Sequence, residues 1–322
     1  MKISFCIPSL NRGDYLIKAI KSICVNEKHS KEFEVCIFNN CSDQSYELVE
    51  KEIENLSRSF NIKYKKSDTR LAIDLSMLSV MKLAIGDYFF LIGDDDFLEP
   101  GGLEEILRLI ATDNFDLAIF NATLINEVRN TTAELIGYKN RRYTDLGRAL
   151  VELKQYCAYS NLLIKGKHIR FDDFEYLIGT SHAYGCFWIR FLKDYENGIN
   201  PVIIIPEASV VSMHVVEKNY NLLEVVFEHA NYEHKLYYKL VGVKSAKILK
   251  EFESDFWKKQ TSLRQLVLFE VMGHDIYDIK KYDPKLYETV YLKIRFAKLL
   301  SKIVKPNKKR IKKVMQFFRS GK

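Results

Sequence analysis

The stretch that decides the fold of this chain is Asp87-Tyr88-Phe89-Phe90-Leu91-Ile92-Gly93-Asp94-Asp95-Asp96-Phe97-Leu98-Glu99-Pro100. Its apolar run of aromatic and β-branched residues predicts a buried strand, and a helix is expected to begin near Gly101. Three carboxylates follow the strand directly, and open α/β sheets bind ligands at the carboxyl ends of their strands. Because neighbouring carboxylates repel one another, the stretch indicates a cation-binding turn. A solvated acidic turn that caps the helix is the alternative, although a cap needs only one Asp.

Outward from this stretch, strands and helices alternate over the first 125 residues. Apolar segments predict strands at 3–7, 33–38, 62–66 and 115–122, with helical periodicity between them. This alternation predicts an α/β fold with a mostly parallel sheet covered by helices on both faces. Polar segments follow three of the strands, at 8–12, 39–43 and 94–96. They are expected to gather at one edge of the sheet as a ligand site.

Beyond residue 125 the pattern is less regular. Helices are expected at 143–159 and 183–192, and strands at 161–165, 202–205 and 209–216. From Leu222 onward almost the whole chain has helical periodicity.

The composition is that of a folded protein with a basic tail. The 322 residues are 47% hydrophobic, which argues against intrinsic disorder. No signal peptide or membrane-spanning segment is expected, and the six cysteines are expected to be reduced and mostly buried in a cytoplasmic protein. Fourteen Lys or Arg against two acids in 281–322 give that segment a net charge of +12, so the rest of the chain carries −5.

Four segments together resemble bacterial family 2 glycosyltransferases, which have the GT-A fold. They are ISFCIPSLNR at 3–12, EVCIFNNCSD at 34–43, LAIGDY at 83–88, and Gly93 to Pro100, which is similar to the DxD motif. The resemblance implies a Rossmann-like GT-A domain over 1–220, with a nucleotide-sugar-binding half at 1–125 and an acceptor half at 126–220. A helical C-terminal region at 221–322 would follow, with a basic amphipathic tail from about 285.

The resemblance also implies residues that bind a nucleotide sugar. These expected residues are Pro8, Ser9, Asn11, Arg12, Asn39, Arg70, Asp94 and Asp95. Asn39 stands where the family usually has the Asp that contacts the base, so the identity of the base stays open. Asn can still bond a base edge because it has both a donor and an acceptor.

A divalent cation, Mn²⁺ or Mg²⁺, is implied at the acidic turn, where it would neutralise a diphosphate leaving group. Its expected ligands come from Asp94, Asp95 and Asp96, with His214 closing the shell. Gly93 stands at the first acidic position of the motif, so the working pair of carboxylates stays open. For His214, a solvent-facing position on a strand is the alternative.

The catalytic base is expected in the acceptor half. Inverting family members usually carry an acidic residue there, but segment 176–184 has no carboxylate. His182 titrates in the right range to accept a hydroxyl proton. Asp172, Asp173 and Glu175 lie just upstream as alternatives, and a retaining mechanism would need no base.

The tail predicts a contact with an anionic membrane. One helical face carries Leu292, Phe296, Leu299, Leu300 and Ile303 among lysines, and a similar pattern follows Pro306. A solvated helix packed on the domain is the alternative, and no motif supports nucleic-acid binding.

These observations predict a metal-dependent, hexosyltransferase-like enzyme that is peripheral to the inner face of the cell membrane. It would move one sugar from a nucleotide-sugar donor to a hydroxyl of a surface polysaccharide, lipopolysaccharide or lipid-linked oligosaccharide, with inversion expected. The alternative is a catalytically silent glycosyltransferase-like protein that binds a glycan or a partner. The intact Asp94–Asp96 triplet argues against this alternative, and the missing acidic base argues for it.

Overall fold

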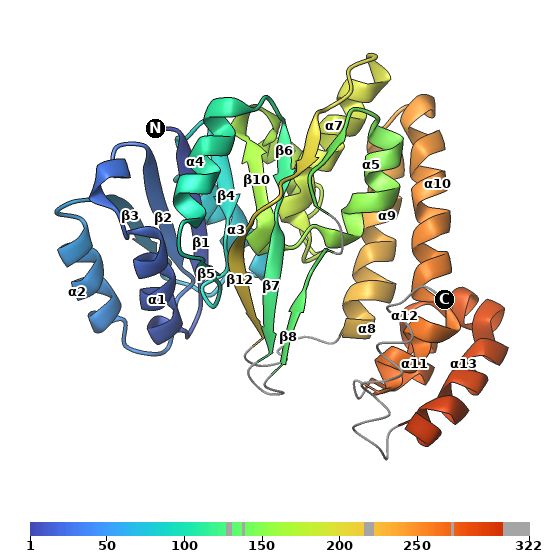
Figure 1. Cartoon of the computed structure of the whole chain (residues 1–322). Coiled ribbons are helices and arrows are strands. Elements are labelled where there is room, and N and C mark those ends of the chain that lie inside the picture. The colour runs from blue at the N-terminus through green and yellow to red at the C-terminus, as the bar shows by residue number, and fades with distance from the viewer. Residues whose placement is uncertain (127–130, 137–138, 216–221, 272–273, 305–322) are drawn as a thin grey trace.

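A computed structural model describes residues 1–126, 131–136, 139–215, 222–271 and 274–304, and its centre is an eight-stranded sheet (Figure 1). The strand order is β3-β2-β1-β4-β10-β6-β11-β9. The strands are β1 (Ile3–Ser9), β2 (Phe33–Asn39), β3 (Asn61–Lys66), β4 (Tyr88–Leu91), β6 (Leu117–Ile119), β9 (Arg141–Tyr143), β10 (Leu162–Lys165) and β11 (Ile203–Ile205).

The first half of this sheet is parallel, which confirms the predicted fold class. β1 pairs in parallel with β2 and with β4, and β2 pairs in parallel with β3. β10 runs antiparallel between β4 and β6. Because β1, β2 and β4 run in the same direction, the polar residues that follow them lie at one edge of the sheet.

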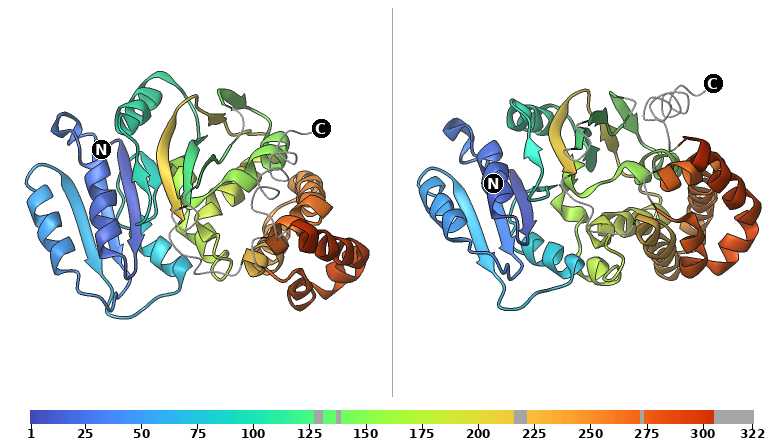
Figure 2. Two further views of the ribbon diagram at one scale, coloured as in Figure 1. Left: turned by 60° about the horizontal axis from the view of Figure 1, so that its bottom comes forward. Right: turned by 90° about the horizontal axis from the view of Figure 1, so that it is seen from below.

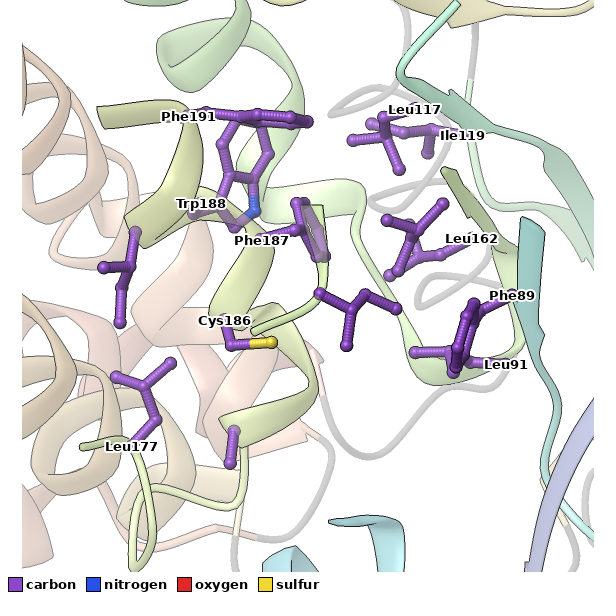
Figure 3. Packing of buried hydrophobic residues seen from close by; sticks show 14 of the residues in the cluster. Phe89, Leu91, Leu117, Ile119, Leu162, Leu177, Cys186, Phe187, Trp188 and Phe191 are labelled. Atoms are coloured by element: carbon purple, nitrogen blue, oxygen red, sulfur yellow. The ribbon is translucent and has the colours of Figure 1, made fainter. Parts of the chain in front are cut away.

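Helices cover both faces of the sheet. One buried cluster joins it to α1 (Gly13–Ile23), α2 (Glu47–Leu56) and α4 (Gly102–Thr112). A second cluster joins the other face to α3 (Ile73–Met81), α5 (Leu146–Leu153) and α7 (Cys186–Glu196). Figure 3 shows Phe187, Trp188 and Phe191 of α7 opposite Leu117, Ile119 and Leu162 of the sheet.

A smaller sheet has the order β5-β12-β7-β8, with strands β5 (Phe97–Leu98), β7 (Asn121–Asn126), β8 (Thr131–Glu134) and β12 (Ser209–Val215). β12 pairs antiparallel with β5, the two-residue strand that directly follows the acidic triplet. This pairing carries His214 to the acidic turn.

The C-terminal region is helical, as expected, and lies at the opposite end of the molecule from α2 and β3 (Figure 2). Its helices are α8 (Leu222–Glu224), the π-helix η6 (Val225–His229), α9 (Ala230–Leu240), α10 (Val243–Gln260), α11 (Leu263–Val271), α12 (Ile279–Tyr282) and α13 (Pro284–Val304). Phe227, Leu266, Phe269 and Ile294 form part of a third buried cluster. Among the described residues, no helix is both long and apolar enough to cross a membrane.

The predicted helix at 143–159 is shorter than expected. After α5 the chain continues as two 3-10 turns, η2 (Lys154–Tyr156) and η3 (Tyr159–Asn161). The Asn161 side chain donates to the carbonyls of Phe120 and Tyr156 and accepts from the Ala158 amide. Such side-chain bonds compete with the hydrogen bonds of a helix, which accounts for the early end.

The remaining short elements are η1 (Glu27–His29), η4 (Gly166–His168), α6 (Phe171–Glu175), η5 (Ala183–Gly185) and η7 (Ile276–Asp278). The part of the predicted tail that follows Pro306 lies outside the described residues. The six cysteines are free thiols, and Cys41 and Cys157 are the two that are only partly buried.

Candidate active site

The acidic turn follows β4, and its first carboxylate binds back to β1. Asp94 is buried, and its Oδ2 atom accepts hydrogen bonds from Ser9 Oγ at 2.8 Å and from the Leu10 amide at 3.3 Å. Ser9 Oγ also bonds the Tyr46 hydroxyl at 2.8 Å, and that hydroxyl accepts from the Arg12 amide. These bonds tie the loop after β1 to the turn after β4.

Arg12 contacts two of the three carboxylates of the triplet. Its Nη1 atom is 2.6 Å from Asp95 Oδ2 and 3.3 Å from Asp94 Oδ1. Burial opposes the charge of Arg12, but the two carboxylates outweigh that effect and raise the pKa of the guanidinium. Arg12 is therefore a fixed positive charge at the edge of the turn.

Asp96 has different hydrogen-bond partners from Asp94. It accepts one hydrogen bond from Ser160 Oγ and one of 2.8 Å from the backbone N–H of His214. The His214 ring packs against Phe97 with a centroid distance of 4.6 Å. His214 thus lies beside the acidic turn, as expected; its role as a metal ligand stays a prediction.

Gly93 has a structural reason to lack a side chain. A Cβ atom at this position would lie 3.1 Å from Asp95 Oδ1, 3.1 Å from Asp96 Oδ2 and 3.3 Å from Ser160 Oγ. The turn therefore leaves little room for a side chain at the position where the motif usually carries its first acid.

Two of the three carboxylates in the turn have raised pKa values. Burial raises the pKa of Asp94 to about 6, against the opposing charge of Arg12. Burial and the adjacent charge of Asp95 raise the pKa of Asp96 to about 7. Asp95 has the more exposed side chain, at 17%. A cation placed here would favour the charged form of all three carboxylates.

Two loops meet at Asn11, which adopts a left-handed backbone conformation with φ of 57°. The side-chain Oδ1 of Asn11 accepts from the backbone N–H of Asp43 at 2.7 Å, and the backbone N–H of Asn11 donates to Ser42 Oγ at 2.9 Å. Arg70 closes the outside of this contact through an ion pair with Asp43. The predicted residues from 8–12, from 39–43 and at Arg70 are thus neighbours at one edge of the sheet.

Asn39 is buried and does not face outward, unlike our expectation for a residue that contacts the base. Its Nδ2 atom donates to the Tyr64 hydroxyl at 3.0 Å, and its Oδ1 atom accepts from the Ser42 amide at 3.0 Å. The residue is 0% exposed, so it has no surface open to a base in this conformation. We therefore place Asn39 behind the site, where it forms the turn.

His182 lies in a loop that a single carboxylate holds. Buried Asp74, near the start of α3, accepts from the backbone amides of Gly179 at 2.8 Å, Ser181 at 3.0 Å and Ala183 at 3.2 Å. Ser181 and Gly179 both have positive φ, so the loop follows a tight path around Asp74. Asp74 thereby fixes the backbone on both sides of His182.

A second carboxylate lies beside the His182 ring. Glu233 of α9 has its Oε2 atom 3.5 Å from His182 Nδ1, while its Oε1 atom accepts from Lys154 Nζ at 2.9 Å and from the Tyr237 hydroxyl. Burial would raise the pKa of Glu233, but Lys154 and His182 hold it below its usual range. The carboxylate next to His182 is therefore ionised.

The acidic alternatives to His182 occupy other positions. Asp173 is buried in α6 and pairs with Lys193 of α7 at 2.5 Å, whereas Asp172 and Glu175 are exposed. None of the three lines the cavity that His182 lines.

Sequence reasoning missed Tyr46, Asp74, Ser160 and Glu233. Each bonds a predicted residue or its loop across more than 30 positions of sequence, and no local pattern marks such a pair.

Comparison with known protein families covers more of the chain than the four short segments that resemble family 2. A family model described as "Glycosyl transferase family 2" matches residues 4–191, which is more than half of the chain. The chain belongs to glycosyltransferase family 2.

Two characterised relatives place this glycosyltransferase among bacterial sugar transferases. It is 31% identical over 199 residues to abequosyltransferase RfbV of Salmonella typhimurium, covering 57% of this chain and 59% of RfbV. It is 25% identical over 128 residues to poly(ribitol-phosphate) β-N-acetylglucosaminyltransferase TarS of Staphylococcus aureus, covering 39% of this chain and 22% of TarS. The chain therefore spans less than two thirds of either relative.

The fold agrees with a solved glycosyltransferase structure. The crystal structure of S. aureus TarS 1–349 in complex with UDP superposes with a TM-score of 0.59 at 16% identity, covering 100% of this chain and 92% of that one. At this identity the likeness concerns the fold alone, and it supports the GT-A assignment.

Proposed function

We propose that this enzyme transfers one sugar, of the hexosyl class, from a nucleotide-sugar donor to a hydroxyl of a surface polysaccharide, lipopolysaccharide or lipid-linked oligosaccharide, with inversion. The observation that carries the proposal is the contact of Ser9 and Arg12, after β1, with Asp94 and Asp95, after β4. It places a guanidinium and clustered carboxylates at the ligand-binding edge of an open α/β sheet.

A nucleoside diphosphate fits this edge chemically. Arg12 offers a charged donor for phosphate oxygens, and the loop after β1 joins it to the acidic turn. TarS, which shares the fold, has been crystallised with UDP and with UDP-GlcNAc. The names of RfbV and TarS denote different transferred sugars, so the family relationship leaves the donor sugar open.

The residues of the acidic turn fit a divalent cation. Three consecutive carboxylates form the turn, and burial raises the pKa of both Asp94 and Asp96. Over the described residues, no group of three His, Cys, Asp or Glu side chains that could hold a metal ion is found. Mg²⁺ and Mn²⁺ commonly take one or two carboxylates together with substrate phosphates. Asp95 and Asp96 would hold the ion, with His214 nearby.

When bound, such an ion supplies Lewis-acid stabilisation of the charge that develops on the leaving diphosphate. The chain itself supplies Arg12 for the same charge and His182 for the acceptor. His182 is proposed to take the proton of the attacking hydroxyl, since an imidazole can act as a general base and its loop is fixed by Asp74.

The outer surface of α13 supports attachment to an anionic membrane. Leu292, Phe296 and Leu299 are 78%, 52% and 56% exposed, and exposed Arg295 and Lys302 lie among them. The predicted face is narrower than expected: Leu300 packs on the helical cluster, and Lys298 pairs with Glu270 at 2.8 Å. Peripheral binding at the inner face of the cell membrane fits this basic, partly apolar surface.

A catalytically silent, glycan-binding protein is the second candidate. The absence of a carboxylate from the loop at 179–183 favours it. The test is hydrolysis of UDP- and dTDP-sugars in the presence of Mn²⁺, measured as released nucleoside diphosphate. Asp96→Ala is expected to abolish turnover. Asp87→Asn, at the other end of β4 and exposed, is the matched control and should retain it. No hydrolysis of any donor by the wild-type protein would rule out the enzyme.

A further inference from the structure

A cavity lies between the His182 loop and the C-terminal helices. Its walls come from α7, η5, α9 and α10, and include Tyr184, Trp188, Ala230, Phe252, Phe256 and Gln260. Lys154, His182, Glu233 and His234 line it as well. Neither the nucleotide-sugar site nor the acidic turn uses this space. Half of its wall comes from residues beyond 220, outside the half of the chain that we expected to bind the acceptor.

We infer that this cavity binds one neutral sugar ring of the acceptor, with the C-terminal helices forming half of the binding site. The inference rests on the proposed function, because it names the chemical class of the acceptor for the same reaction.

The volume suits one ring. It is about 200 Å³, below the roughly 300–1,000 Å³ of pockets that enclose drug-sized ligands. The cavity is therefore too small for a nucleotide sugar, whose base, ribose, diphosphate and sugar would have to fit together.

The lining has the two surfaces that a sugar ring needs. Trp188, Phe252 and Phe256 provide an aromatic wall on which the C–H face of a ring can pack. One buried nitrogen, His234 Nδ1, has no hydrogen-bond partner among the described residues. Buried polar atoms are normally bonded, so this atom beside an aromatic wall indicates that a hydroxyl-bearing ligand belongs there.

The charge in the cavity is balanced. Lys154 and Glu233 pair at 2.9 Å, and the Glu233 carboxylate is ionised. Burial lowers the pKa of His234 to about 3, with Lys154 adding to the effect, so its ring is neutral at physiological pH. Among the described residues that line the cavity, the one Lys or Arg is Lys154, which is already paired, so a phosphate group would enter at a large desolvation cost. A neutral hexose carries no such cost.

The cavity is also in the right place for transfer. His182, the proposed base, lines it, and so does Tyr184. The Tyr184 ring packs edge-on against Tyr159 at 5.5 Å, and the next residue, Ser160, donates to Asp96. Contacts that run from Tyr184 through Tyr159 and Ser160 to Asp96 therefore connect the lining of the sugar cavity to the acidic turn.

Saturation-transfer difference NMR on the full chain tests the inference directly. The probes are methyl α-glycosides of glucose, galactose, mannose and rhamnose, with glycerol 3-phosphate as the charged polyol. We expect a signal from at least one glycoside and none from glycerol 3-phosphate. Ala230→Phe fills the cavity and should lower the glycoside signal roughly fivefold or more.

Two further variants keep the test decisive. Gln260→Ala, at the half-buried end of α10, should also weaken the signal. It replaces Ala230→Phe in the test if that variant fails to fold. Tyr238→Ala is the matched control, because this residue lies on α9 outside the cavity and its hydroxyl donates to Glu253. Folding of each variant is checked by thermal unfolding. The inference would be overturned if no glycoside gave a signal, if both cavity variants kept the wild-type signal, or if glycerol 3-phosphate displaced the glycoside.

Donor hydrolysis by the wild-type protein separates this inference from the proposed function. Glycoside binding without hydrolysis of any donor would leave the cavity assigned and reject the enzyme. Donor hydrolysis together with unchanged glycoside binding in the cavity variants would support the enzyme and reject the cavity as the sugar-binding site.

Discussion

His182 Nδ1 lies 3.5 Å from Glu233 Oε2, so a buried carboxylate from the C-terminal helices adjoins the loop of the transferase domain. This contact links a region outside the matched family segment to the proposed base. It gives helix α9 a functional reason to pack where it does.

Replacing Glu233 with Gln removes the anion that pairs with both His182 and Lys154. Breaking a buried ion pair costs about 3–5 kcal/mol, so the unfolding midpoint in urea should fall clearly. Because His182 loses the carboxylate that orients it, kcat for transfer should fall about tenfold or more, with the donor KM within about twofold. Glu228→Gln, an exposed substitution on the adjacent η6, is the control. Equal kcat values for the two variants would exclude a positioning role.

Asp74→Ala should disorganise the loop at 179–183. The substitution leaves three backbone amides without their acceptor, each at a cost of about 1–3 kcal/mol. We expect transfer to drop about tenfold or more while donor hydrolysis in the absence of acceptor is retained, since Asp74 does not contact the acidic turn. Asp74→Asn should recover part of the loss, and exposed Asp68→Ala should have no effect. Full transfer by Asp74→Ala would show that the loop needs no such support.

His234→Phe should reduce the sensitivity of stability to acid. The folded pKa of His234 is about 3, below the ordinary histidine value of 6.5, so the unfolded chain binds the extra proton as the pH falls below 6.5. Stability is then lost by at most about 1.4 kcal/mol per pH unit between those values. Phe has no titrating group, and its ring can pack on Phe252 and Phe256 as the imidazole does. Urea unfolding at pH 7.5 and pH 5 measures the difference, and identical losses for both proteins would contradict the assignment.

Membrane attachment is best tested on the outer face of α13. Truncation after Asp283 would remove the basic tail, but it would also take Ile294 and Ala297 out of the third buried cluster. Replacing Leu292, Phe296 and Leu299 with Gln leaves that cluster intact. Sedimentation with vesicles rich in phosphatidylglycerol should decrease several-fold, because the apolar part of the contact is lost.

A matched triple variant provides the control for the membrane test. Ile85, Ile199 and Val243 are also strongly exposed apolar residues, and they lie away from α13. Their replacement by Gln should leave sedimentation unchanged. Equal loss in both triple variants, or no loss in either, would exclude the α13 face as the attachment surface.

Local pattern was sufficient for the sheet and the acidic turn. Fully buried strands such as Phe33–Asn39 read as continuous apolar runs, and each polar segment that follows a parallel strand must lie at the same edge. The pattern failed at 143–159, where helical periodicity continued but the Asn161 side chain bonds the carbonyls of Phe120 and Tyr156. Hydrophobic periodicity cannot predict these side-chain hydrogen bonds, because Phe120 lies far away in the sequence.

By itself, the sequence determined the parallel α/β core, the position of Asp94 to Asp96 at its ligand-binding edge, and the family. These follow from the two periodicities of buried strands and helices and from the order of short motifs along the chain. Only the tertiary structure decided that Asn39 faces inward, that Asp74 holds the His182 loop, and that Glu233 adjoins His182. These pairings depend on which buried groups satisfy each other's hydrogen bonds and charges, and packing brings such groups together from segments that are far apart in the chain.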